Sequence, residues 1–420
     1  MNLLLIFVLL TFFVIISFKK LEWGLYLICF LLPSYLIRFK IGPIPFTFLE
    51  GMILILFLVW ILKVFLDKNL INIIKKFPEN KFFIPGILLV VAVTVSVFIA
   101  PAQKPALGIW KAYFIEPLLL FLVFINTVKS KKQIKRVFWS LGLSAAIIAI
   151  ISIVQYITGF SIPESYNLPN IKRATAVYGY PSAIGLFLAP VLVLFVGFII
   201  NKFKDKKIFF AGLGIIMLLL TTIIMAKTEG AVISVLVATF FILMFTKYRK
   251  FIIISTLIII LLIFLIPQTR DYIVTLITFK DVSGDVRIAL WQGTLRLIKN
   301  HPIFGAGLAG FPELYKQYKE AKHVEISLYP HNIFLNFWVE TGILGLISLI
   351  WIIVNYFREG FRKYSLRTKH YSLILLAVMI CILVYGLVDA PYFKNDLSCL
   401  FWIWIGLMVV TTKLEISEST

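Results

Sequence analysis

The chain alternates between long apolar runs and short, mostly basic links along almost its whole length. About thirteen of these runs approach the roughly 20 apolar residues that a helix needs to cross a bilayer. They cover residues 2–18, 21–36, 47–66, 82–100, 108–128, 137–157, 181–200, 208–226, 230–245, 251–266, 334–357, 371–388 and 397–410. The pattern predicts an all-α polytopic integral membrane protein with about 12 or 13 transmembrane helices.

One long polar segment, residues 267–333, interrupts this pattern. Within it Arg287 stands four residues before Trp291, a spacing that puts both on one face of an expected amphipathic helix. The glycines of GAGLAG predict a turn, and a second short helix can begin at Pro312. We therefore expect a single membrane domain, residues 1–420, that carries one long loop with short amphipathic helices.

The end of this loop has an unusual polar pattern. Tyr329, Pro330, His331 and Asn332 directly precede a new apolar run, so the histidine and the asparagine are expected at the mouth of a span. Glu340 follows nine residues after His331, at apparent membrane depth. Polar groups at such depth cost free energy of insertion and are often functional.

Composition excludes a water-soluble protein. The chain is 61% hydrophobic and only 15% charged, too little charge for a soluble surface. The formal charge of +21 would suggest a nucleic-acid partner in a soluble protein, but here the basic residues cluster in short links, as the positive-inside rule expects. The three cysteines lie in apolar runs without metal-ligand spacing, so we expect no disulfide framework and no zinc site.

The basic pattern also predicts orientation. The run KSKKQIKR, residues 129–136, is the strongest cytoplasmic mark, and the alternation of spans then puts residues 158–180 and 267–333 outside. The first of these outside loops contains Lys172 and Arg173. Basic residues on the outer side are not what the positive-inside rule produces, which makes them candidates for a site.

Three stretches of the sequence carry a resemblance. They are KRATAVYGYPSAIGLFLAP, RIALWQGTLRLIKNHPIFGAGLAGF and PHNIFLNFWVETGILGL. Together they resemble the successive motifs of the O-antigen ligase and polymerase family of membrane glycosyltransferases, most closely over residues 287–345. The number and order of the spans are also similar to that family, whose fold is that of the C-type membrane glycosyltransferases.

The resemblance implies an enzyme of the cytoplasmic (inner) membrane. Such an enzyme takes a glycan from a polyprenyl-pyrophosphate carrier and joins it to a hydroxyl of a lipid-anchored, protein or glycan acceptor on the outer, periplasmic side. Carried over by motif, Arg173 and Arg287 hold the pyrophosphate and His331 acts on the acceptor. Where the family commonly has Ser-Arg-Gly, this chain has Lys227-Thr-Glu-Gly, so Lys227 is a candidate substitute for a third arginine.

The chemistry of these residue types is consistent with those roles. A forked, permanently charged guanidinium can bind two oxygens of a pyrophosphate leaving group, and a neutral imidazole can take a proton from a hydroxyl near neutral pH. We expect no cofactor and no metal, because the outside loops contain no acidic cluster with ligand spacing. The residues expected to line the substrate site are Lys172, Lys227, Trp291, Asn332, Glu340 and Asp389.

Several of these residues have ordinary explanations as well. An arginine beside a membrane often binds headgroups, and a histidine before a span can be an interfacial cap. Asp389, with Lys394 nearby, either lines the site or belongs to a solvated turn. Glu116 lies inside an apolar run and could pair with Lys111 or with another span.

Two further function classes stay open. A polymerase differs from a ligase only in its acceptor, and a transporter or flippase for the same lipid-linked glycan would also be polytopic and basic. The polar groups lie beside one loop on one face, whereas transporters carry charges near mid-membrane, which favours an enzyme. GAGLAG also matches a dinucleotide fingerprint, but it lacks the preceding strand and the cytoplasmic βαβ unit that the fingerprint requires.

Overall fold

The structure is a computed structural model, and it describes residues 3–68, 70–71, 73, 79–168, 172–200, 205–319, 328–362 and 370–417. The described chain is almost entirely helical, apart from a two-stranded hairpin. His323 lies outside the described residues.

The helices are α1 (Leu3–Lys19), α2 (Leu21–Phe30), α3 (Phe48–Leu66), α5 (Phe83–Ile99), α6 (Gln103–Ile109), α7 (Glu116–Thr127), α8 (Lys131–Thr158), α9 (Pro181–Ile200), α10 (Lys206–Met225), α11 (Glu229–Met244), α12 (Arg249–Leu265), α13 (Pro267–Ile277), α14 (Val282–Asn300), α15 (Phe311–Leu314), α16 (Ile333–Arg362), α17 (His370–Gly386) and α18 (Asn395–Ser417). Short 3-10 helices cover Leu32–Leu36, Glu164–Tyr166 and Tyr315–Gln317, and a π-helix covers Trp110–Ile115. The hairpin strands are β1 (Arg38–Ile41) and β2 (Ile44–Thr47), paired antiparallel.

The prediction of an all-α polytopic membrane protein is confirmed. Among the described residues, seven helical segments are long and apolar enough to cross a membrane, and α12 with α13 would make an eighth if that bent pair is one span. Five shorter apolar helices, of 10–17 residues, accompany them. Each apolar run of the sequence is therefore found as helix, although α2 ends at Phe30 and the Pro-rich link after it forms the unpredicted hairpin.

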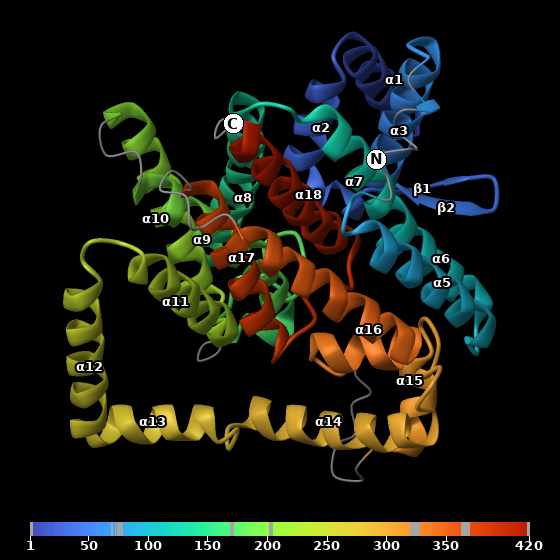
Figure 1. Ribbon diagram of the computed structural model, residues 1–420. Coiled ribbons are helices and arrows are strands. Elements are labelled where there is room, and N and C mark those ends of the chain that lie inside the picture. The colour runs from blue at the N-terminus through green and yellow to red at the C-terminus, as the bar shows by residue number, and fades with distance from the viewer. Residues whose placement is uncertain are drawn as a thin grey trace.

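The helices form one bundle, and α13 and α14 run end to end across one face of it (Figure 1). Helix α12 stands at the margin of the bundle and turns by 102° into α13. Helix α14 has 19 residues and is longer than the short amphipathic helices expected in this loop. Its apolar face, which includes Leu290 and Leu297, packs into a small second core with Phe311 and Val339. The described parts of the loop, residues 267–319 and 328–333, thus cover one face of the bundle.

Hydrogen bonds between distant segments show which helix ends share this face. Near the end of α17, Tyr385 donates to the carbonyl oxygen of Ser182 at the start of α9, 3.3 Å away. At the start of α18, Asn395 donates to Glu50 at the start of α3, 3.0 Å away. The first contact joins the end of α17 to the start of α9, and the second joins the starts of α18 and α3.

The opposite face carries the basic links. Lys81 before α5 pairs with Glu359 near the end of α16, and Arg136 near the start of α8 pairs with Glu22 at the start of α2. The link between α7 and α8, which opens the basic segment 129–136, lies at the far end of the bundle from α13 and α14 (Figure 1). The helix ends alternate between two faces as the sequence predicted.

The expected pairing of Glu116 is wrong. Lys111 instead pairs with Glu50 at 3.0 Å, and Asn395 also donates to that carboxylate. The π-helix between α6 and α7 separates Lys111 from Glu116 and shifts their relative direction by its extra residue per turn. Within the described residues, neither carboxylate oxygen of Glu116 has a hydrogen-bond partner.

Helix α16 is broken at Gly342, whose φ of 69° and ψ of −178° are not helical. The GAGLAG loop packs its backbone onto this break. The Ala306 N–H donates to Val339 at 2.6 Å, and the Ile343 N–H donates to Ile303 at 2.9 Å. A Cβ at Gly342 would overlap the Ile303 carbonyl oxygen, so this contact requires glycine.

We expect Gly342→Ala to destabilise the protein by more than about 1 kcal/mol, because alanine disfavours a positive φ and its Cβ would push the loop away. Gly86→Ala is the matched control, since a Cβ there meets nothing within 4 Å. Thermal unfolding of the detergent-purified variants, followed by size-exclusion chromatography, measures the difference. Equal melting temperatures for the two variants would contradict this account of the break.

Candidate active site

His331 lies at the mouth of α16 and is held from both sides. Its own backbone has a positive φ of 49°, a strained conformation for a non-glycine residue. The next residue, Asn332, caps α16 by accepting from the Phe334 and Leu335 N–H groups at 3.0 and 3.1 Å. The Asn332 amide also donates to the Leu387 carbonyl oxygen at 3.0 Å, which ties this cap to the end of α17. Asn332 therefore positions its neighbour.

The imidazole of His331 pairs with a buried carboxylate. Its Nδ1 lies 3.2 Å from Oδ1 of Asp389, whose side chain is 2% exposed, whereas that of His331 is 29% exposed. With the proton on Nδ1, this contact orients the ring and leaves Nε2 with a lone pair. The ring of Tyr329 packs beside it, with centroids 4.6 Å apart. The arrangement provides an oriented, accessible base.

Arg287 reaches the same turn from α14. Its Nε donates to the Val388 carbonyl oxygen at 3.1 Å, one residue before Asp389. In the described part of the chain no hydrogen bond engages its two terminal nitrogens, and the side chain is half-buried. A guanidinium held through Nε can present both terminal nitrogens to one anion.

Arg173 is anchored differently. Its Nε donates to the Ala226 carbonyl oxygen and its Nη2 to that of Lys227, both at 3.0 Å. One terminal nitrogen, Nη1, is left without a hydrogen bond in the described chain. Arg173 therefore clamps the turn between α10 and α11 and offers a smaller contact to an anion than Arg287 does.

The two other lysines expected at the site lie around this clamp. The Lys172 ammonium packs over the ring of Tyr156 at 5.2 Å. Lys227 has a positive φ of 48° and an exposed side chain. Lys227 is connected to the site through its backbone carbonyl oxygen, which accepts the hydrogen bond from Arg173, and not through its side chain.

Tyr385 brings the separate groups into one neighbourhood. Its phenol lies within electrostatic range of Asp389, Arg287 and Arg173. It is buried between α9 and α11, where Cβ atoms on Gly185 or Gly230 would overlap it. Both arginines, from loops more than a hundred residues apart, thus converge near the His331–Asp389 pair.

Trp291 and Glu340 stabilise the elements around the site. The Trp291 indole donates to the Pro330 carbonyl oxygen at 2.9 Å, directly before His331. Glu340 is 4% exposed and accepts the Ala309 N–H at 2.6 Å, so it holds the GAGLAG loop against α16. Its carboxylate faces backbone donors rather than the arginines. These two side chains secure the path of the chain on either side of His331.

Three residues of this neighbourhood were not singled out as site residues from the sequence. Tyr385 and Tyr180 stand at the ends of apolar runs, where tyrosine is common in any membrane protein, so nothing marked them. Lys394 was considered only together with Asp389 and Asp396, as a group that either lines the site or belongs to a solvated turn. Within the described residues, no three His, Cys, Asp or Glu side chains are grouped so that they could hold a metal ion.

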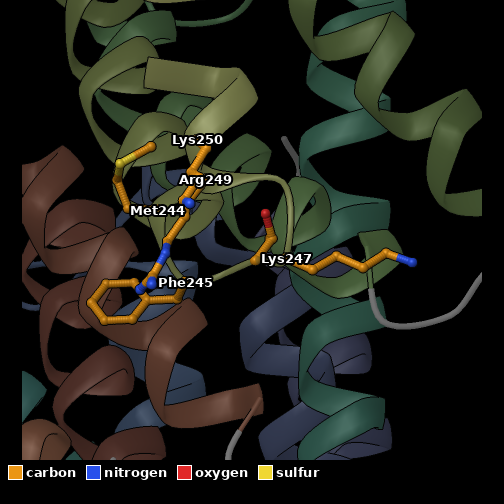
Figure 2. A pocket seen from close by; sticks show the side chains of 6 residues that line it. Met244, Phe245, Lys247, Arg249 and Lys250 are labelled. Carbon is orange, nitrogen blue, oxygen red and sulfur yellow. The ribbon is translucent and has the colours of Figure 1, made fainter. Parts of the chain in front are cut away.

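A separate pocket lies between α11 and α12 and is lined by basic side chains (Figure 2). Its lining includes Lys247, Arg249 and Lys250. Helix α11 begins at the turn that Arg173 clamps and ends at this pocket. Its 16 residues span about 24 Å. The pocket belongs to the opposite, basic face and not to the candidate site.

Comparison with known proteins adds independent support. Residues 214–350 match the O-antigen ligase family model, a stretch that contains Arg287 and His331 but neither Arg173 nor Asp389. The chain is 35% identical over 97 residues to an uncharacterized protein of Haemophilus influenzae, which covers 21% of this chain and 24% of that protein. It is 27% identical over 135 residues to a Rickettsia conorii protein with the name "putative polysaccharide ligase", covering 30% of this chain and 31% of that protein.

The aligned stretches span only about a quarter and a third of those relatives' own lengths. The family model covers α11 to α14, the GAGLAG loop, and α16 up to its break and beyond. These are the elements that carry Arg287, His331 and the contacts between them. Over residues 214–350, then, the chain matches the O-antigen ligase family, and two of the site's residues, Arg287 and His331, fall within that match.

Proposed function

We propose that the protein transfers a glycan from a polyprenyl-pyrophosphate carrier to an acceptor hydroxyl, as an O-antigen ligase-like enzyme. The family supports glycan transfer of the ligase or polymerase type. The observation that carries the finer proposal is the His331–Asp389 pair beside Arg287, whose terminal nitrogens are open to a ligand. A base next to an anion-binding guanidinium is the combination that this transfer needs.

In this reaction His331 accepts the proton of the acceptor hydroxyl at Nε2. The acceptor oxygen then forms a bond to the anomeric carbon of the glycan, and the bond from that carbon to the pyrophosphate oxygen breaks. Asp389 keeps the imidazole in the tautomer with the proton on Nδ1 and stabilises the imidazolium once it forms. The carboxylate therefore acts through the histidine.

The leaving pyrophosphate gains negative charge as its bond to the sugar breaks. Arg287 binds two of its oxygens through the two terminal nitrogens, and Arg173 adds a contact through Nη1. Both guanidinium groups are already oriented by backbone carbonyl oxygens, so little reorganisation is needed during the reaction. In our proposal this fixed positive charge needs no help from a metal ion.

We further propose that the site faces the outer side of the cytoplasmic membrane. The basic segment 129–136 is at the face opposite α13 and α14, and positive-inside bias makes that face cytoplasmic. The donor would then be a lipid whose pyrophosphate lies at the outer headgroup level. The acceptor would be a lipid-anchored glycan, a protein or a growing glycan chain.

The deciding experiment supplies purified protein with a polyprenyl-pyrophosphate glycan and candidate acceptors. Release of polyprenyl pyrophosphate together with a glycosylated acceptor is the expected result. The identity of the product distinguishes a ligase from a polymerase. Movement of the intact donor across a proteoliposome membrane without release would instead indicate a transporter and overturn the proposal.

Orientation can be tested with single cysteines, because the three native cysteines are buried. A membrane-impermeant maleimide added to intact cells should label Lys316→Cys but not Lys132→Cys, since both positions are exposed and lie on opposite faces. Permeabilised cells, in which both variants should be labelled, are the control. Labelling of Lys132→Cys alone in intact cells would reverse the topology and remove the site from the outer side.

We expect Arg287→Lys to lose most transfer activity although the charge is kept, because an ammonium cannot bind two phosphate oxygens in a fixed fork. The loss should be about 2–4 kcal/mol of barrier, or roughly 30- to 1,000-fold in rate. Arg296→Lys is the matched control, since Arg296 lies on the same helix and donates to the Tyr318 carbonyl oxygen. Wild-type turnover by Arg287→Lys would refute the forked contact.

We expect His331→Ala to retain the lipid-linked donor, because the arginines remain, while transfer falls by about two to four orders of magnitude. His331→Gln should be equally slow, since an amide can hydrogen-bond but cannot accept the proton. Retention of labelled donor and formation of product are measured separately, with His301→Ala at the end of α14 as control. If the alanine variant loses the donor and the glutamine variant transfers normally, His331 is a donor-binding residue instead.

A further inference from the structure

Lys394 occupies an unusual setting in the link between α17 and α18. Its ammonium lies over the rings of three tyrosines, 4.5 Å from the centroid of Tyr178, 4.7 Å from Tyr180 and 5.5 Å from Tyr35. The Lys394 side chain is half-buried, and in the described chain it forms neither an ion pair nor a hydrogen bond. A partly desolvated cation on an aromatic wall is available to a ligand.

The charges around Lys394 exclude an anion as its best partner. Burial lowers the pKa of Lys394, while the nearby carboxylates of Asp396 and Asp389 raise it. Two carboxylates thus lie within electrostatic range of this ammonium and would compete with a further acid group for it. Lys394 can instead donate up to three hydrogen bonds to neutral oxygen atoms, such as sugar hydroxyls.

A continuous row of side chains joins Lys394 to the reacting centre. Tyr180, which Lys394 contacts, shares a hydrogen bond with Tyr329, and the ring of Tyr329 packs beside that of His331. Tyr180, Tyr329 and His331 are all partly accessible. Burial raises the pKa of both phenols, so they stay protonated and can donate hydrogen bonds.

The row extends away from the arginines. Arg173 and Arg287 approach Tyr385 from the side of α11 and α14. Lys394 instead contacts Tyr35, in the 3-10 helix after α2, on the side of α18. The arginines and the Lys394 cluster therefore reach the His331–Asp389 pair through different neighbours, Arg287 through Val388 and the tyrosines through Tyr329. In a displacement at the anomeric carbon, the acceptor approaches opposite the leaving group.

We propose that Lys394, Tyr180 and Tyr329 form a subsite for an uncharged sugar ring of the acceptor, with the buried Tyr178 supporting Lys394 from below. The Tyr329 ring packs against the C–H face of the sugar, and the Lys394 ammonium, which lies over the Tyr180 ring, donates to the sugar hydroxyls. The inference rests on the proposed function, because it assigns the acceptor to the side of His331 opposite the pyrophosphate. It narrows the acceptor from any hydroxyl compound to one that ends in a neutral sugar.

Kinetics with Lys394→Met test the subsite. At saturating donor, we expect the KM for the acceptor to rise roughly 10- to 100-fold, the loss of a charge-assisted hydrogen bond, with little change in donor KM. Lys280→Met, at an exposed position between α13 and α14, should leave both constants unchanged. An unchanged acceptor KM for Lys394→Met overturns the proposal. A rise in donor KM alone overturns the assignment of this subsite to the acceptor. It would mean that the subsite binds a sugar of the donor glycan.

Lys394 could instead serve only to balance the charge of Asp396, and a double variant separates the two roles. In Lys394→Met with Asp396→Asn both charges are removed, so stability should return toward that of the parent if the single variant has lost it. The subsite requires that acceptor KM stays high in the double variant. Recovery of both stability and KM would show that Lys394 only balances charge.

A binding measurement avoids dependence on activity. Saturation-transfer NMR of the purified protein with the methyl glycosides of glucose, galactose and mannose, and with methyl glucuronide, reports direct contact with each sugar. We expect saturation of neutral glycosides by the parent and its loss in Lys394→Met. Equal signals from parent and variant across the panel, or binding of the glucuronide alone, would overturn the subsite. Failure of the parent to release polyprenyl pyrophosphate would instead count against the proposed function.

Discussion

The relative position of α14 and α16 depends on the contact between the GAGLAG loop and the break at Gly342. Backbone groups that leave a helix at membrane depth must find partners inside the protein, and here loop and break satisfy one another. Glu340 supplies a further acceptor, for the Ala309 N–H. The hydrogen bond from Trp291 to Pro330 in turn holds the middle of α14 against the mouth of α16. Arg287 and His331 are therefore parts of one rigid frame.

The link between α17 and α18 completes the site from the opposite side. Over a few residues it supplies the Val388 carbonyl oxygen to Arg287, the Asp389 carboxylate to His331, and the Lys394 ammonium to the tyrosine wall. A short turn can serve three groups because α17 and α18 pack tightly beside α9 and α16 and leave the link little freedom. Asp389 is central to this link because its carboxylate lies close to both positively and negatively charged side chains.

The chain's departure at Lys227 from the motif common in the O-antigen ligase family has a structural counterpart. Arg173 donates to the carbonyl oxygens of Ala226 and Lys227, so this turn interacts with the site through its backbone. The exposed Lys227 side chain is not required for that contact. A further cation, Lys394, lies instead over the tyrosine rings. The arginines and Lys394 thus have different neighbours and, in our proposals, different ligands.

The sequence by itself determined the fold class, the order of the apolar helices and the long polar segment that carries Arg287 and His331. These follow from apolar run length, basic links and local spacing, which are properties of neighbouring residues. It also singled out Asp389, but not as the partner of His331. It left Glu116 to pair with Lys111 or another span, whereas Lys111 pairs with Glu50, and it missed Tyr180 and Tyr385.

Only the tertiary structure decided which polar groups meet. The pairs His331–Asp389 and Arg287–Val388 join residues 58 and 101 positions apart, and no local pattern encodes such a register. Tyrosines at the ends of spans look alike in sequence, because the membrane interface favours them everywhere. Packing around the broken α16 and the α17–α18 link selects which of them face the site, since that choice depends on helix rotation and loop path.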